Sequence, residues 1–281
     1  MRIPLLALMT GLFASILQAQ SPTGQTVQDR VNADIEAREP VVAHVVVALC
    51  DNANQGIVPV PKSLGDGQNP RTNLYWGAAY GVRTFFKRQS HFELLEATWD
   101  LGPNVLDSAV FRARVDRSGA KIDLFVVAEA WDGSEMAGAL SHFLKLAAGH
   151  DPTDVKVSGV KGQIHAGGAS AVVVFVGHNG LMEMPPPIQP APRPGARHRS
   201  SMVLACASRP FFLDLLHKGG SHPALLTTGL MAPEAYTLEA ALTAFATGQQ
   251  PSEIREAAAA AYHRYQQCGT NAALRLFSSE P

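Results

Sequence analysis

Three runs of apolar, mostly β-branched residues constrain the fold of this chain more than any other feature. They span residues 41–50 (VVAHVVVALC), 121–130 (KIDLFVVAEA) and 169–177 (ASAVVVFVG). Runs of this kind suit strands that are buried on both faces, as in a parallel sheet covered by helices. The sequence therefore predicts the centre of a large α/β domain.

Helical and turn signals separate these runs. An alternating segment at 108–116 and a Ser118-Gly119 turn predict a β-hairpin that includes the 121–130 strand. Further strands are predicted over residues 201–206 and 223–229. Helices are predicted over residues 73–88, 134–148, 211–218, 233–246 and 252–267. The alternation predicts an α/β three-layer sandwich, with a mostly parallel central sheet and helices on both faces.

Two long loops interrupt this pattern. Residues 51–72 are rich in Gly, Pro, Asn and Asp, which form turns. The loop at 181–200 contains the proline-rich stretch PPPIQPAPRP and is expected to be exposed. A hypothesis from position alone is that this loop covers a site until it is cut at exposed Arg193, Arg197 or Arg199. Long loops in compact domains are usually functional or disordered.

The N-terminal 19 residues are typical of a secretory signal peptide. Arg2 precedes an uncharged apolar run at 3–17, and the tripeptide at 17–19 (LQA) suits cleavage. The run is shorter than the roughly 20 residues of a membrane span, so a retained anchor is the less favoured alternative. We expect a secreted or periplasmic protein with no stable membrane span after cleavage. A polar lead-in or short amphipathic helix at 20–40 then precedes one α/β domain at 41–281.

Composition narrows the partners and cofactors. The formal net charge is −1 and neither sign clusters, which disfavours nucleic acid as a partner. His217 and His222 match no metal-ligand spacing, so we predict no metal and no other cofactor. Because there are three cysteines, at least one thiol is free or pairs outside the chain. If two of them form a bridge, Cys50 and Cys268 are the favoured pair, which leaves Cys206.

Polar residues follow three of the predicted strands. Asp51 follows the first, His178 follows the 169–177 strand, and Cys206 ends the next. Ligands bind at the carboxyl ends of parallel strands, and neighbouring strands lie about 5 Å apart. An imidazole can take the proton of a thiol nucleophile, and the turn Asn179-Gly180 offers backbone N–H groups to an oxyanion. The alternative is a core cysteine and a turn histidine without a joint role.

The segments VVVFVGHNG and MVLACAS resemble the two motifs of caspase-like (clan CD) cysteine peptidases, which include the CHAT, gingipain and legumain groups. In that family the catalytic histidine ends one sheet strand and the cysteine ends the next. The resemblance implies a caspase-like fold with His178 as base and Cys206 as nucleophile. It also implies that Asp51 takes a specificity position that favours a basic side chain before the cleaved bond. Asn179 stands where the family usually has glycine, with Gly180 one place later.

Three classes of function follow from this pattern. The first is an exported peptidase that hydrolyses peptide or protein substrates through a Cys-His dyad. The second is a catalytically inactive caspase-like module that binds a partner, and the third is an unrelated exported α/β hydrolase or ligand-binding protein. Asp51 has its own alternative, because a loop aspartate followed by asparagine often forms a turn.

Overall fold

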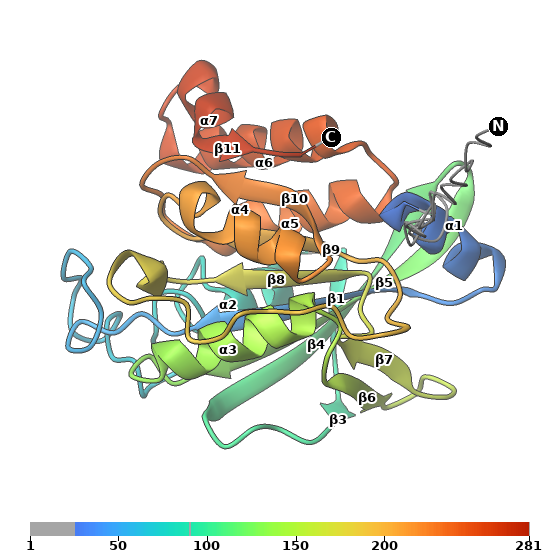
Figure 1. Cartoon of the computed structure of the whole chain (residues 1–281), viewed down its shortest axis with the longest axis horizontal. Coiled ribbons are helices and arrows are strands. Elements are labelled where there is room, and N and C mark those ends of the chain that lie inside the picture. Colours follow the sequence, from blue (N-terminus) through green and yellow to red (C-terminus); the bar gives the residue numbers. More distant parts are fainter. Residues whose placement is uncertain (1–25, 90, 281) are drawn as a thin grey trace, which may run out of the picture.

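A computed structural model describes residues 26–89 and 91–280 of the chain, and an eight-stranded mixed sheet forms its centre (Figure 1). Five strands run parallel, in the order β5-β1-β8-β9-β10. These are β5 (Ala120–Trp131), β1 (Val41–Ala48), β8 (Val172–Val176), β9 (Ser200–Leu204) and β10 (His222–Thr227). The order reverses beside β1, so the sheet is doubly wound and has a switch point at its carboxyl edge.

The remaining strands of the sheet are antiparallel and lie at its two sides. β4 (Val105–Arg117) pairs with β5 as the predicted hairpin, and β2 (Phe92–Leu95) follows it. β11 (Phe277–Ser278) closes the other side against β10. The prediction of an α/β sheet is therefore confirmed, whereas its mostly parallel character holds for the central five strands.

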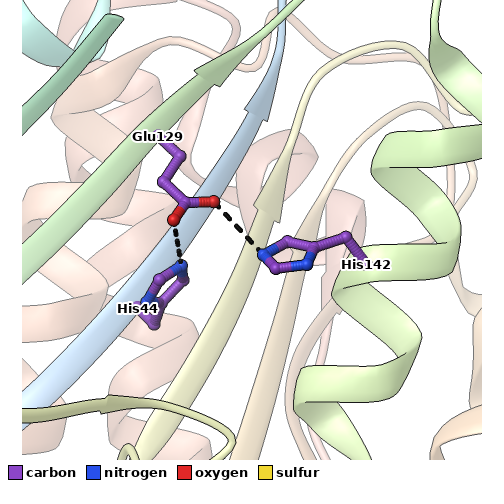
Figure 2. A group of neighbouring side chains, drawn as sticks. All are labelled: His44, Glu129 and His142. Atoms are coloured by element: carbon purple, nitrogen blue, oxygen red, sulfur yellow. Dashed lines mark ion pairs between the residues drawn. The ribbon is translucent and has the colours of Figure 1, made fainter. Parts of the chain in front are cut away.

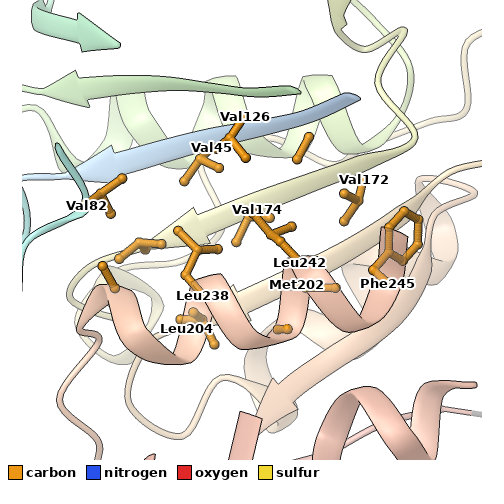
Figure 3. Packing of buried hydrophobic residues seen from close by; sticks show 14 of the residues in the cluster. Val45, Val82, Val126, Val172, Val174, Met202, Leu204, Leu238, Leu242 and Phe245 are labelled. Atoms are coloured by element: carbon orange, nitrogen blue, oxygen red, sulfur yellow. The ribbon is translucent and has the colours of Figure 1, made fainter. Parts of the chain in front are cut away.

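Helices cover both faces of the sheet. α3 (Met136–Ala147) and α4 (Arg209–Lys218) pack on one face, while α2 (Val82–Arg88), α5 (Ala235–Ala246) and α6 (Pro251–Gln266) pack on the other. α1 (Val27–Glu36) forms in the predicted lead-in, and α7 (Thr270–Leu276) follows α6. Figure 3 shows α5 laying Leu238, Leu242 and Phe245 on the valines of β1 and β8. The predicted helices at 134–148, 211–218, 233–246 and 252–267 are thus confirmed within a few residues.

The first apolar run behaves as predicted, because every residue of β1 is buried. Val45 and Val47 face α5, whereas Val46 and Ala48 face α3. Full burial of one valine side chain stabilises a fold by about 1.5–3 kcal/mol, so this strand contributes on both faces. The one ionisable residue of the strand, His44, is buried on the α3 side.

A second, smaller sheet was not predicted. β3 (Ala97–Thr98), β6 (Pro152–Val157) and β7 (Ile164–Gly167) pair antiparallel and cover Val42, Phe125 and Val127. Its strands are short, and polar residues alternate with buried ones in β6. A weak local pattern of this kind becomes a strand only because its partners are present.

The predicted helix at 73–88 is wrong over its first half. The helix begins only at Val82, and residues 73–81 form turns around the buried Asn73. The Asn73 side chain accepts from the Cys50 N–H at 3.0 Å and donates to the Cys50 carbonyl at 2.8 Å. These bonds to the end of β1 replace helical hydrogen bonds, so a tertiary contact overrides the helical spacing of the sequence.

The loop at 181–200 is anchored at its C-terminal end. The backbone N–H and the side chain of Arg193 donate to the carbonyls of Ala148 and Gly149, and Arg199 donates to Ala147. Arginines here satisfy the free carbonyls at the end of α3. Arg199 is buried, so its predicted exposure as a cleavage site is wrong, whereas Arg197 is exposed.

The cysteines do not form the favoured bridge. Cys50, Cys206 and Cys268 are all free thiols, with Cys50 buried and Cys268 exposed. Because these two lie at the end of β1 and beyond α6, the Cys50–Cys268 pairing is wrong. The predicted signal peptide at 1–19 lies outside the described residues. Within residues 26–89 and 91–280, no helix has both the length and the apolar character needed to cross a bilayer.

Candidate functional site

The carboxyl edge of the parallel sheet brings two predicted site residues onto neighbouring strands. β8 pairs with β9, and Val176 is opposite Leu204 at the end of the ladder. His178 and Cys206 each follow two residues later, on strands whose axes are about 4.8 Å apart. The switch point between β1 and β8 lies at the same edge, where doubly wound sheets bind ligands.

His178 is nearly buried and makes a hydrogen-bonded contact with a carboxylate that was not predicted. Its Nε2 lies 2.8 Å from Oε1 of Glu183, whose side chain is partly exposed. The short helix η1 (Gly180–Met182) turns the chain back so that Glu183 faces the imidazole. A carboxylate only accepts hydrogen bonds, so Nε2 carries the proton and Nδ1 remains available as a base. The sequence signal for this contact is only a glutamate five residues after the histidine.

Cys206 presents its thiol at the end of β9 and is partly exposed. The Met231 N–H donates to Sγ at 3.4 Å, and Sγ lies 3.5 Å from the Met231 carbonyl oxygen. The next residue, Ala207, has φ of +44°, a conformation that L-residues rarely adopt. Its N–H donates to the Gly229 carbonyl at 2.8 Å, which helps hold the turn. Such a strained turn at a possible nucleophile is a reason to consider function.

The turn after His178 ties β8 to β9. The Asn179 side chain is buried and donates to the Cys206 carbonyl at 2.7 Å, and its φ is −82°. The left-handed conformation that glycine would permit is therefore not used at Asn179. The Gly180 N–H donates to the His178 carbonyl at 3.1 Å. The oxyanion-hole role of Asn179 and Gly180 stays a prediction, in which the Gly180 N–H must first leave His178.

In the described chain, His178 and Cys206 make no hydrogen bond to each other. His178 pairs with Glu183, while the thiol contacts the backbone of Met231. Catalytic hydrogen bonds are often long in a free enzyme and tighten when substrate binds, so this geometry is compatible with a dyad.

Asp51 is buried at the end of β1 and organises the 51–72 loop. Its carboxylate accepts from the Ala53 N–H at 2.8 Å, from the Asn54 side chain at 2.9 Å and from the Gln68 side chain at 3.1 Å. Burial raises the pKa of Asp51, but hydrogen bonds from Asn54, Gln68 and Ala53 together hold the pKa below its usual value. Asp51 therefore forms the loop turn that the sequence offered as its alternative role. Its role toward a substrate stays a prediction.

Comparison with known proteins finds no relative of this chain. No protein-family model matches the chain, and neither a curated protein nor a solved structure does so. The chemistry of the side chains must carry the functional argument.

A second ionisable cluster lies under α3, and the sequence interpretation missed it (Figure 2). This buried cluster consists of His44 on β1, Glu129 on β5 and His142 on α3. His44 Nε2 lies 3.5 Å from Glu129 Oε1, and His142 Nε2 lies 3.2 Å from Oε2. The indole N–H groups of Trp99 and Trp131 also donate to this carboxylate. The available signal was an ionisable residue inside each of two apolar strands.

The buried cluster has the residue types and spacing of a metal site, but one backbone contact opposes that function. The Gly167 N–H donates to His44 Nδ1 at 3.1 Å, so the proton of neutral His44 is on Nε2. A metal-ligating nitrogen must be free of a proton, and the other ring nitrogen then donates. With its proton on Nε2, the nitrogen that faces Glu129, His44 is not set up to ligate a metal there.

The charge of Glu129 is favoured by these side chains. Burial raises the pKa of Glu129, but the close imidazoles of His44 and His142 together hold the pKa well below its ordinary value. Glu129 thereby joins β1, β5 and α3 through its close contacts with these two side chains. We assign the cluster to stability.

Proposed function

We propose that this chain is an exported cysteine peptidase of the caspase-like kind, with Cys206 as nucleophile and His178 as general base. The observation that carries the proposal is the pairing of β8 with β9, each followed two residues later by one member of the dyad. That relation agrees with the resemblance of the GHNG and ACAS segments to clan CD. The proposed export rests on the N-terminal 19 residues.

The proposed reaction is acyl transfer through a thioester. His178 Nδ1 takes the thiol proton, and the Cys206 sulfur attacks the carbonyl carbon of the peptide bond. The tetrahedral oxyanion is received by backbone N–H groups, for which Asn179 is the favoured donor because Gly180 already donates to His178. His178 returns the proton to the leaving amine. Water, deprotonated by His178, then attacks the thioester carbonyl carbon. The C–S bond breaks, the acid is released, and the proton on His178 returns to the Cys206 sulfur.

The proposed substrate class rests on Asp51, which follows β1, the strand next to β8. Asp51 would accept a basic side chain before the cleaved bond if the substrate displaced Asn54 or Gln68, since these donors already use the carboxylate. A peptide library with each residue type at that position tests this preference, and Arg or Lys is the expected optimum.

A second candidate function is a non-catalytic caspase-like module. It is favoured by one observation: the hydrogen bonds of Cys206 and His178 go to Met231 and Glu183, and none joins the two residues. In that case the thiol would react as an ordinary cysteine, and the carboxyl edge would bind a partner without cleaving it.

Alkylation kinetics distinguish the two candidates. Iodoacetamide modification of each thiol is followed by mass spectrometry from pH 5 to 9, in wild type and in His178→Ala. Exposed Cys268 is an internal reference, and buried Cys50, whose pKa burial raises to about 11, should react slowest. A dyad predicts that Cys206 reacts faster than Cys268 at pH 6 and loses this advantage in His178→Ala. Equal rates at Cys206 and Cys268 in both proteins would favour the binding module.

A further inference from the structure

We propose that Glu183 is a positioning residue for His178, and that Gly56 in the 51–72 loop provides the space in which the Glu183 carboxylate lies. This inference rests on the proposed thiol–imidazole function. It adds a third side chain to the dyad and connects the site to a loop more than 100 residues away in sequence.

The contact between Glu183 and His178 meets the requirements for orienting a base. The two atoms are 2.8 Å apart, a normal length for a charge-assisted hydrogen bond. The carboxylate keeps the imidazole proton on Nε2, so Nδ1 is the nitrogen that can accept the thiol proton. It also offers a negative charge to the imidazolium that forms when His178 takes that proton. The imidazole is nearly buried, which limits exchange of this partner for water.

The position of Glu183 depends on a glycine in the 51–72 loop. A Cβ placed on Gly56 would lie 2.7 Å from Cδ of Glu183, and nearer still to Oε1, the oxygen that contacts His178. The three atoms nearest to this Cβ all belong to the Glu183 side chain. Gly56 does not have a positive φ, so alanine can adopt the same backbone conformation. An alanine at 56 should therefore displace the Glu183 carboxylate and leave the fold intact.

The loop that contains Gly56 is itself ordered by buried contacts. Gln55 donates to the carbonyls of Leu49 and Gly133, and Asp51 binds Asn54 at the start of the loop. Gly56 is thus held at the carboxyl edge next to the His178 turn. The long loop is part of the site because it fixes the carboxylate that orients the base.

The test uses the full chain with four single variants and the Glu183→Gln/Gly56→Ala double variant besides wild type. Glu183→Gln removes the charge, and Gly56→Ala displaces the unchanged carboxylate. Gly102→Ala is the matched control, because a Cβ there meets nothing within 4 Å. His178→Ala reports on the dyad itself. The alkylation rate of Cys206 is measured against pH, and ¹⁵N chemical shifts of the His178 ring report which nitrogen carries the proton.

We expect Glu183→Gln and Gly56→Ala each to slow Cys206 alkylation at pH 6 on the order of tenfold. This is less than the roughly 10²–10⁴-fold contribution of a general base, because the imidazole itself remains. Gly102→Ala should react at the wild-type rate. In a Glu183→Gln background, Gly56→Ala should have no added effect, since both changes act through one carboxylate. The ring shifts should report the proton on Nε2 in wild type and a mixture of tautomers in both site variants.

The outcomes separate this inference from the proposed function. If His178→Ala leaves the Cys206 rate unchanged, the dyad is absent and the proposed function fails. If His178→Ala slows the reaction while Glu183→Gln and Gly56→Ala react as wild type does, the dyad stands and the role of Glu183 is refuted. Thermal unfolding of each variant controls for folding. Should Glu183→Gln fail to fold, the rate and the ring shifts of Gly56→Ala decide alone.

Discussion

Two imidazole–carboxylate groups lie on one sheet, and they differ in what surrounds them. The edge site (His178, Glu183 and Cys206) follows the ends of β8 and β9, where the glutamate and the thiol are partly exposed. The buried cluster (His44, Glu129 and His142) lies within the strands and under α3. Glu129 is surrounded by four N–H-bearing side chains, whereas Glu183 has one such partner in the structure.

The comparison shows that a histidine beside a glutamate can have different surroundings in the same fold. In the buried cluster the backbone N–H of Gly167 fixes the tautomer of His44 and leaves no ring nitrogen available. In the edge site the carboxylate contacts Nε2 of His178, so Nδ1 is the unprotonated nitrogen of the neutral ring. Cys206 follows the end of the neighbouring strand. The two groups therefore differ in position: one lies within the strands and the other follows the strand ends.

The largest expected effect is the loss of activity at the edge site. Cys206→Ala should lower peptide hydrolysis by a factor on the order of 10⁴ or more, because the nucleophile is removed, and His178→Ala should be nearly as severe. Rates on a peptide library measure this, with Cys268→Ala as the matched cysteine control. Activity that survives in Cys206→Ala would remove the edge site from catalysis.

Substitution in the buried cluster should lower the free energy of unfolding more than substitution of Glu183 in the edge site does. Glu129→Ala should lower the free energy of unfolding by about 3–5 kcal/mol, because two indole N–H groups lose their acceptor and two imidazoles lose the nearby carboxylate. Glu183→Ala should cost less than about 1 kcal/mol, because a partly exposed pair contributes little. Urea denaturation measures both variants. Similar losses in the two would erase the contrast between the sites.

The pH dependence of stability should show the contribution of the buried Glu129 carboxylate. The pKa of Glu129 is depressed in the folded protein, so the unfolded chain binds more protons as pH falls below its usual carboxyl pKa of about 4.3. The contribution of Glu129 is therefore complete above that pH and is lost as pH falls toward the depressed folded value. Wild type should lose stability more steeply below pH 4 than Glu129→Gln does, as measured by denaturation at each pH. Parallel curves would mean that Glu129 is not charged in the fold.

The smallest expected effect concerns metal. Added Zn²⁺ should raise the melting temperature by less than about 1 °C, because a ligand that does not bind the folded state does not stabilise it. His142→Ala is the control, since it removes one of the three side chains with metal-ligand spacing. A zinc-dependent stabilisation that disappears in His142→Ala would show that His44 gives up the Gly167 contact and binds metal.

Several features of the fold were predictable because their signals are local. The valine-rich run at 41–48 forms a strand wherever helices cover both of its faces, and the 105–131 hairpin follows from alternation and a Ser118-Gly119 turn. His178 and Cys206 were recognisable because a polar residue directly after a buried strand must lie at the edge of the sheet. Local pattern thus determined the main strands, most helices and the dyad candidates.

Only the tertiary structure decided which distant residues meet. Asn73 leaves a helical pattern because its side chain binds the end of β1. His44, Glu129 and His142 converge because β1 and β5 are neighbouring parallel strands and α3 packs on one face of them. Glu183 reaches His178 because η1 reverses the chain and Gly56 has no side chain in its way. The spacing of apolar residues predicts the secondary structure of a segment and which of its faces is buried. Contacts between segments depend on register, strand order and the space that neighbouring residues leave, and none of these is written in a local window.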